Sequence, residues 1–275
     1  MPYCVRTAAL TALLEPDPVR KAALASALYA DWQAGRASVD PALRLAEPPD
    51  GLPGRPARPE LVEPRLLARR SMQSSEGRAT MLHAIAHIEF NAINLALDAV
   101  WRFADLPLEF YGDWLRVASE EAYHFGLLSA RLADLAHAYG DFPAHDGLWE
   151  MCERTAQDVL ARMALVPRTL EARGLDASPP IRARLAQAGD LASAGILDII
   201  LRDEIGHVRI GNRWFRHLCT QASLDPLEAY AALAERYHAP RLRGPFNLDA
   251  RRAAGFDEAE LDALERRLEA PGAPE

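Results

Sequence analysis

The chain has 275 residues, 49% of them hydrophobic and 25% charged, and its formal net charge is −8. This size predicts one main domain with extensions, and the negative charge without a basic stripe argues against a dedicated nucleic-acid binder. The chain has neither a run of about 20 apolar residues nor a cysteine framework, so we expect a cytoplasmic protein without membrane spans or disulfides.

The first part of the chain, residues 1–70, is predicted to form one helix followed by a proline-rich segment. Asp17 and Pro18 are typical of a helix start, and Gly35 is typical of a helix end. Residues 40–64 contain seven prolines, which favour an extended backbone. We expect this segment to wrap around the main domain.

The main domain, residues 71–222, is predicted to be an antiparallel four-helix bundle. Its helices are expected over residues 75–103, 108–139, a third stretch from 147 to a turn near 189, and 190–219. Pro167, Pro179 and Pro180 disturb the third stretch, because proline removes a helical hydrogen bond. We therefore expect the segment RGLDASPP, which ends at Pro180, to be irregular.

The last part, residues 223–275, is predicted to be a helical extension. One helix follows Pro226, and another begins at Asp257, where Asp257 and Glu260 have the spacing of a capping box. No alternating pattern typical of β-strands competes with these helices. The sequence therefore predicts an all-α protein with an N-terminal helix, a wrapping segment, a four-helix bundle and C-terminal helices.

Carboxylates and histidines interrupt the apolar stripes of three bundle helices. Glu89 lies within the stripe of the first helix. Glu121 and His124 lie within that of the second, and Glu204 and His207 within that of the fourth. A buried carboxylate is costly unless it is paired, hydrogen-bonded or bound to a cation. Three helices that direct such groups inward are most simply explained by a shared cation.

The spacing of these residues predicts two matched helical hairpins. Glu-x-x-His places both side chains on one face of a helix, where one metal ion can contact both. Glu89 precedes Glu121 by 32 residues, and Glu171 precedes Glu204 by 33. The predicted metal ligands are Glu89, Glu121, His124, Glu171, Glu204 and His207. Four carboxylates and two imidazoles suit two iron ions, with manganese or a mixed manganese–iron pair as alternatives.

The sequence does not decide which of three glutamates in the third helix is the metal ligand. The apolar stripe of a straight helix does not pass through Glu171, although Pro167 can kink the helix and rotate the residues after it. Glu150 and Glu153 are the alternatives. A further Glu-x-x-His begins at Glu235, but it lies off its stripe and no glutamate precedes it by 32 or 33 residues, so we assign it no metal.

Several other polar residues are predicted to act only indirectly. His83 and His87 are four residues apart but lie off the direction of Glu89, so we expect core hydrogen bonds or support of a metal ligand. Asp203 is expected to support a ligand of the other hairpin. No side chain is predicted to be a separate catalytic acid or base, because chemistry of this kind belongs mainly to the metals.

The sequence around these residues resembles a known family. The six predicted ligands look like the ligand set of the ferritin-like superfamily. The segments HAIAHIE, LEARGLD, RDEIGH and IGNRWF are similar to the bacterial ferritin-like family called domain of unknown function 455, over about residues 15–268. The resemblance implies a ferritin-like bundle with a di-iron or related centre that reacts with oxygen or peroxide.

The expected function is that of a dimetal oxidoreductase, which acts with oxygen on a small organic substrate and takes electrons from a donor. One alternative is a ferroxidase or another iron-handling protein. A second is hydroxylation of a tRNA nucleoside, for which Arg65, Arg69 and Arg70 could form a basic face. A third is a metal-free interaction protein. The substrate, the redox partner and the oligomeric state are left open by the sequence.

Overall fold

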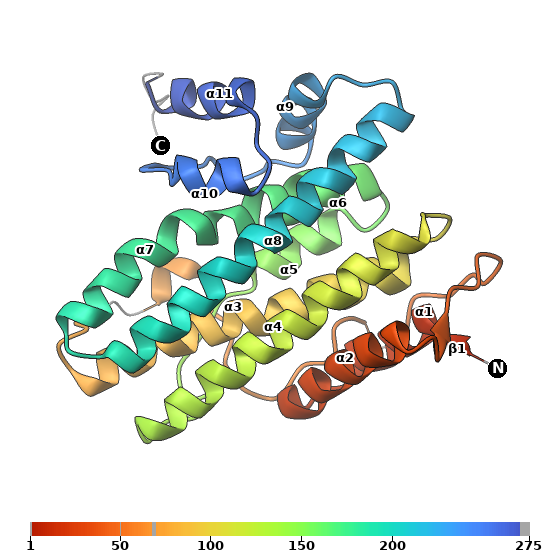
Figure 1. Cartoon of the computed structure of the whole chain (residues 1–275). Coiled ribbons are helices and arrows are strands. Elements are labelled where there is room, and N and C mark those ends of the chain that lie inside the picture. The colour runs from red at the N-terminus through yellow and green to blue at the C-terminus, as the bar shows by residue number, and fades with distance from the viewer. Residues whose placement is uncertain (1, 50, 68–69, 270–275) are drawn as a thin grey trace. The chain divides into compact units, whose positions relative to one another are not determined.

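The computed structural model of the chain is mostly helical and describes residues 2–49, 51–67 and 70–269 (Figure 1). The predicted all-α class is confirmed. Among the described residues, none of the helices combines the length and the apolar character that crossing a membrane requires. The chain divides into two compact units, Met1–Glu150 and Met151–Glu275. The three-part division predicted from the sequence stays a prediction.

The first unit begins with two helices, of which only the second was predicted. These are α1 (Val5–Leu14) and α2 (Pro18–Gln33), and Asp17 caps α2 through its side chain, as its position before a proline suggests. Two very short strands, β1 (Tyr3–Cys4) and β2 (Ala37–Ser38), pair in parallel and were not predicted either.

Two long helices, α3 (Ser75–Arg102) and α4 (Leu108–Asp134), form the centre of the first unit and run in opposite directions (Figure 1). Ser74 caps α3 by accepting a hydrogen bond from the amide of Gly77. Helix α1 packs on α3 and helix α2 packs on α4. Along most of its length α3 is buried on all sides. Polar side chains of α3 can therefore be shielded from water whichever way they point.

The proline-rich segment, residues 40–64, has little regular structure, as its composition predicts, and ends in the 3₁₀ turn η1 (Pro64–Leu66). The amide of Gly54 donates a hydrogen bond of 2.9 Å to the carbonyl of Leu13 at the end of α1. Further along, the backbone of Ala144 exchanges two hydrogen bonds with the segment. The segment therefore runs along α1 and the loop that follows α4.

The second unit is built on a helical hairpin preceded by shorter pieces. The elements are α5 (Gly147–Arg154), which spans the boundary between the units, α6 (Val159–Leu165), the π-helix η2 (Val166–Glu171), α7 (Ala172–Gln187) and α8 (Leu191–Gln221). Gly189 has φ of 81° and turns the chain between α7 and α8, and Asp190 caps α8. The predicted turn near residue 189 is confirmed.

The prediction for the third helix was wrong in two respects. The chain leaves the helix between α5 and α6, and the segment RGLDASPP, expected to be irregular, lies inside α7. Pro179 lacks the amide hydrogen that would reach the carbonyl of Leu175. The side-chain amide of Asn247 donates to that carbonyl at 3.2 Å instead. A residue far away in the sequence thus satisfies the backbone group, and α7 continues.

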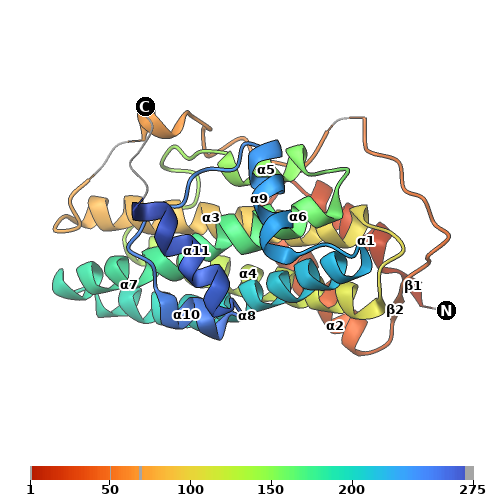
Figure 2. The ribbon, with the colours of Figure 1, turned by 90° about the horizontal axis from the view of Figure 1, so that it is seen from above.

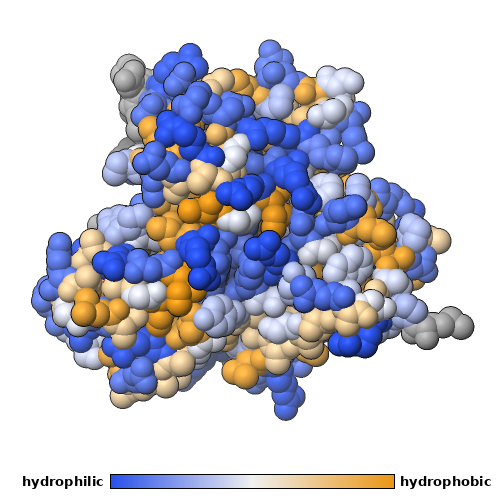
Figure 3. All heavy atoms as spheres, in the orientation of Figure 1, coloured by the Kyte–Doolittle hydropathy of each residue, from blue (hydrophilic) through white to orange (hydrophobic). Residues whose placement is uncertain are grey.

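Three helices complete the second unit within the described residues: α9 (Pro226–Arg236), α10 (Leu248–Ala253) and α11 (Glu258–Glu269). Asp257 and Glu260 form the predicted capping box, because each backbone amide donates to the other side chain at 2.9 Å. Helices α10 and α11 lie next to one another (Figure 2) and share an apolar core with α7 and α8. The face of this region that is visible in Figure 3 is mainly hydrophilic.

Candidate metal centre

Three predicted ligands come together between α3 and α4. Glu89 on α3, and Glu121 and His124 on α4, each offer a ligand atom, and these atoms lie within 4.8 Å of one another. His124 Nδ1 is 3.1 Å from Glu89 Oε2 and 3.4 Å from Glu121 Oε2. All three side chains are buried. This buried group of carboxylates and an imidazole could hold a metal ion.

Burial and close contact change the ionisation of these three side chains. Desolvation, and then repulsion from Glu121, raises the pKa of Glu89 to about 8. Desolvation alone would lower the pKa of His124, but hydrogen bonds and attraction from Glu121 and Glu89 outweigh it and raise the pKa to about 11. The group therefore favours additional positive charge, which either protons or a metal ion can supply.

The second unit contains the other half of the predicted ligand set. On α8, His207 Nδ1 lies 3.4 Å from Glu204 Oε1, the same separation as between His124 and Glu121 on α4. Glu204 and His207 are both buried. Glu171 is buried as well and is the last residue of the π-helix. Each unit thus has a buried Glu-x-x-His pair and a buried glutamate upstream of it.

The π-helix explains why the periodicity of the third helix did not pass through Glu171. A π-helical turn holds more residues than an α-helical turn, so the residues after Pro167 are rotated relative to a straight helix. Insertions of this kind are frequent at functional sites. Glu150 and Glu153, the alternative ligands, are exposed. Of the three glutamates considered, only Glu171 is buried.

Gly211 on α8 allows the π-helix to approach closely. A Cβ atom at Gly211 would lie 2.5 Å from Pro167 Cβ and 2.7 Å from Pro167 Cγ. We expect Gly211→Ala to lower the free energy of unfolding by about 1–3 kcal/mol, because the two helical elements must move apart. Metal affinity should fall as well, since Glu171 belongs to the displaced element. Denaturant unfolding and metal titration measure the two effects.

Gly195, on the same helix, provides a matched control. A Cβ atom added there meets nothing within 4 Å. Gly195→Ala should stabilise the protein by up to about 1 kcal/mol, because alanine favours a helix over glycine. If the two alanine variants were equally stable, the close approach at Gly211 would have no energetic consequence.

The residues predicted to support the metal ligands have other contacts in the structure. His87 Nδ1 lies 2.8 Å from the hydroxyl of Tyr139, and the amide of Asn91 lies 3.0 Å from His87 Nε2. Asp203 accepts two hydrogen bonds from the guanidinium of Arg202. Support of a metal ligand by His87 or Asp203 stays a prediction.

A buried lysine that contacts α3 was missed by sequence reasoning. Lys21 on α2 is completely buried, and its Nζ donates to Asn94 Oδ1 at 2.6 Å and to the carbonyl of Gly54 at 2.8 Å. Desolvation lowers the pKa of Lys21 to about 7. A signal was present in the sequence, because Lys21 is its single lysine. A buried lysine can become neutral, whereas an arginine at the same position would keep its charge.

The basic face considered for a nucleic-acid substrate contains paired charges in the described part of the chain. Arg65 pairs with Glu63 at 2.6 Å, and Arg70 pairs with Glu76 at 2.7 Å. Arg69 lies outside the described residues. Because each of the two described arginines is neutralised by a glutamate, this surface offers less positive charge than the sequence alone indicated.

Comparison with known proteins identifies the family. The family model described as "Protein of unknown function (DUF455)" matches residues 14–262, so the chain belongs to that family, as the resemblance predicted. A protein of Haemophilus influenzae (strain ATCC 51907 / DSM 11121 / KW20 / Rd), described as an uncharacterized protein, is 51% identical over 222 residues, which cover 78% of this chain and 77% of its own. No solved structure matches. Membership of the ferritin-like superfamily stays a prediction.

Proposed function

We propose that this DUF455 protein is a dimetal oxidoreductase, in which two iron ions react with oxygen or peroxide to oxidise a small organic substrate. The recurrence of one arrangement supports the proposal most strongly. In each unit a buried Glu-x-x-His pair has its histidine Nδ1 3.4 Å from its glutamate, and a buried glutamate precedes the pair. If the buried glutamates and histidines only formed ion pairs with one another, the same arrangement would not need to occur in both units.

The two halves of the ligand set are proposed to hold the same pair of ions, within a ferritin-like four-helix bundle. Each half offers two carboxylates and one imidazole, a donor set that favours iron or manganese over copper or structural zinc. Six ligands for two ions leave positions for oxygen and substrate, as catalytic centres require. The bound ions would supply the redox chemistry, whereas the buried side chains fix their positions and keep water away.

Oxygen consumption tests this function. Protein loaded with ferrous iron under anaerobic conditions should consume oxygen repeatedly when a reductant is supplied, and protein loaded with zinc should not. Lack of oxygen uptake by the iron-loaded protein would contradict the proposal. A large particle on gel filtration that stores far more than two iron ions per chain would favour iron storage instead.

A further inference from the structure

The π-helix η2 is held in place by Arg168, one of its own residues. Arg168 is buried, with 3% of its surface exposed. Its guanidinium donates hydrogen bonds to Asn212 Oδ1 on α8 at 3.0 Å and to Glu260 Oε1 on α11 at 2.6 Å. Because Arg168 lies within Val166–Glu171, these two bonds tie the π-helix to two other helices of the second unit.

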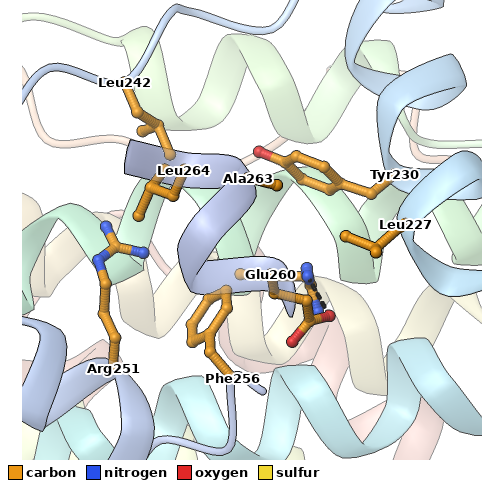
Figure 4. A pocket seen from close by; sticks show the side chains of 9 residues that line it. Leu227, Tyr230, Leu242, Arg251, Phe256, Glu260, Ala263 and Leu264 are labelled. Carbon is orange, nitrogen blue, oxygen red and sulfur yellow. Dashed lines mark hydrogen bonds and ion pairs between the residues drawn. The ribbon is translucent and has the colours of Figure 1, made fainter. Parts of the chain in front are cut away.

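Aromatic rings enclose the same guanidinium. Its central carbon lies 4.7 Å from the ring centre of Phe215, 4.9 Å from that of Phe256 and 5.2 Å from that of Tyr230. Phe256 and Tyr230 lie with Glu260 around one small cavity of the second unit (Figure 4). An arginine keeps its charge when it is buried, so this arrangement requires both the paired carboxylate and a fixed position of the side chain.

Both partners of Arg168 are themselves fixed by the C-terminal part of the second unit. Glu260 is buried, and its Oε2 accepts a hydrogen bond of 2.5 Å from Arg216. Asn212 donates through Nδ2 to the carbonyl of Ala254, directly after α10, at 2.9 Å. The position of the π-helix therefore depends on α10 and α11, which carry none of the six predicted metal ligands.

The direction of Glu171 depends on the π-helix that ends there. π-Helices are rare and short, so contacts with the rest of the protein must stabilise them. An α-helix turns by about 100° per residue, so a change of η2 to a regular α-helix would rotate Glu171 by about 100° relative to α6. Glu171 is buried in the observed arrangement. A contact that fixes the π-helix thus also fixes the side on which this carboxylate lies.

We propose that Arg168 is a positioning residue for the metal centre: by holding the π-helix against Asn212 and Glu260, it keeps the carboxylate of Glu171 where it can bind metal. This role rests on the proposed dimetal function, because Glu171 is one of the predicted ligands. Arg168 acts through Glu171 and is not a ligand itself, since a guanidinium offers no acceptor atom to a cation. The proposal also gives α10 and α11 a function, namely to support metal binding from a distance.

Cobalt titration of the metal-free full chain tests this role. Arg168→Met removes both hydrogen bonds but keeps an apolar side chain, and Glu260 retains Arg216 as a partner. We expect the affinity for cobalt to fall by at least about tenfold, as replacement of supporting groups commonly does. The visible absorption of bound cobalt should change as well, because the loss of a carboxylate ligand changes its coordination. Parent-like affinity and absorption in Arg168→Met would overturn the proposal.

Arg216→Met is the matched control. Arg216 also pairs with Glu260, but its side chain is 35% exposed and its other hydrogen bonds include one to the carbonyl of Gly255. Because exposed ion pairs contribute little, its replacement should leave the cobalt affinity within about twofold of the parent value. Equal losses in Arg168→Met and Arg216→Met would contradict a specific role of Arg168.

Arg168→Lys provides the answer if Arg168→Met does not fold. Lysine keeps a positive charge beside Glu260 but lacks the planar fork with which the guanidinium reaches both Glu260 and Asn212. We therefore expect Arg168→Lys to bind cobalt more weakly than the parent protein. A folded Arg168→Lys protein with the cobalt affinity of the parent would overturn the proposal.

A double mutant shows whether Arg168 acts through Glu171. Glu171→Gln weakens this ligand without changing the size of the side chain. Adding Arg168→Met to Glu171→Gln should lower the cobalt affinity by less than about twofold further, because the two changes affect the same ligand. A second loss as large as that in the parent background would show that Arg168 affects binding by another route, and would overturn the proposal.

The titration also separates this role from the proposed function. Parent protein that binds no cobalt would contradict the dimetal centre and, with it, the role of Arg168. Cobalt binding by the parent protein that is unchanged in Arg168→Met would contradict the role of Arg168 alone.

Discussion

Replacing Glu121 by glutamine is expected to reduce the proposed iron content of two ions per chain to less than one. Glu121 is completely buried and lies with Glu89 and His124 in the cluster between α3 and α4. Glutamine has the same size but offers only one neutral oxygen acceptor, so it would hold a cation much more weakly than the carboxylate does. Changes near a metal already cost about 10–100-fold in affinity when they affect only supporting groups, so a larger loss is expected here.

Glu120→Gln is the matched control for this experiment. Glu120 is the preceding residue, pairs with Arg116 at 2.8 Å and has 28% of its side chain exposed. Its replacement should leave the iron content unchanged, as measured by elemental analysis after gel filtration. Full iron content in Glu121→Gln would show that the cluster does not bind metal.

The free energy of unfolding is expected to rise between about pH 7 and pH 10 because of Lys21. Its pKa is about 7 in the folded protein and about 10.5 when exposed to water. Between these values the unfolded chain binds more protons, so a higher pH favours the folded state. Each pKa unit corresponds to about 1.4 kcal/mol, so the rise amounts to a few kcal/mol.

The charges near Lys21 have smaller effects on this pH dependence. Arg55 in the proline-rich segment lowers the pKa of Lys21 further, and Glu15 after α1 opposes that shift. Lys21→Met removes the ammonium group and should remove the rise in stability over this pH range. Urea unfolding of both proteins at pH 7, 8 and 9 measures the difference. The same slope in Lys21→Met as in the parent would show that Lys21 is not buried with a lowered pKa.

The order and ends of most helices could be predicted because local chemistry determines them. Asp17 before a proline, Asp190 after a glycine and the Asp257–Glu260 pair all cap helices as their positions suggest. Helix α1 (Val5–Leu14) was missed because apolar residues cover most of its surface, so no polar face reveals the helical period.

The third element could not be predicted because its structure depends on distant contacts. The π-helix changes the rotation of the residues around Glu171, and periodicity assumes a regular turn. The helix through Pro179 persists because Asn247 satisfies the free carbonyl of Leu175. A local pattern contains no information on such a hydrogen bond.

The residues of the candidate site were predictable to different degrees. Glu89, Glu121 and His124 were identified by their positions within apolar stripes, because a charged group in such a stripe is either paired or bound. Lys21 was not identified, because lysine is normally a surface residue and its aliphatic stem suits many environments. Sequence patterns thus show which face of a helix is buried, but not which polar groups meet there.

The number of iron ions in protein purified without added metal tests the central claim most directly. If carboxylates and imidazoles of both units hold one pair of ions, elemental analysis of the folded chain after gel filtration in the presence of a chelator should give two ions of iron, or of manganese, per chain. A folded chain that retains no transition metal under these conditions would contradict the account.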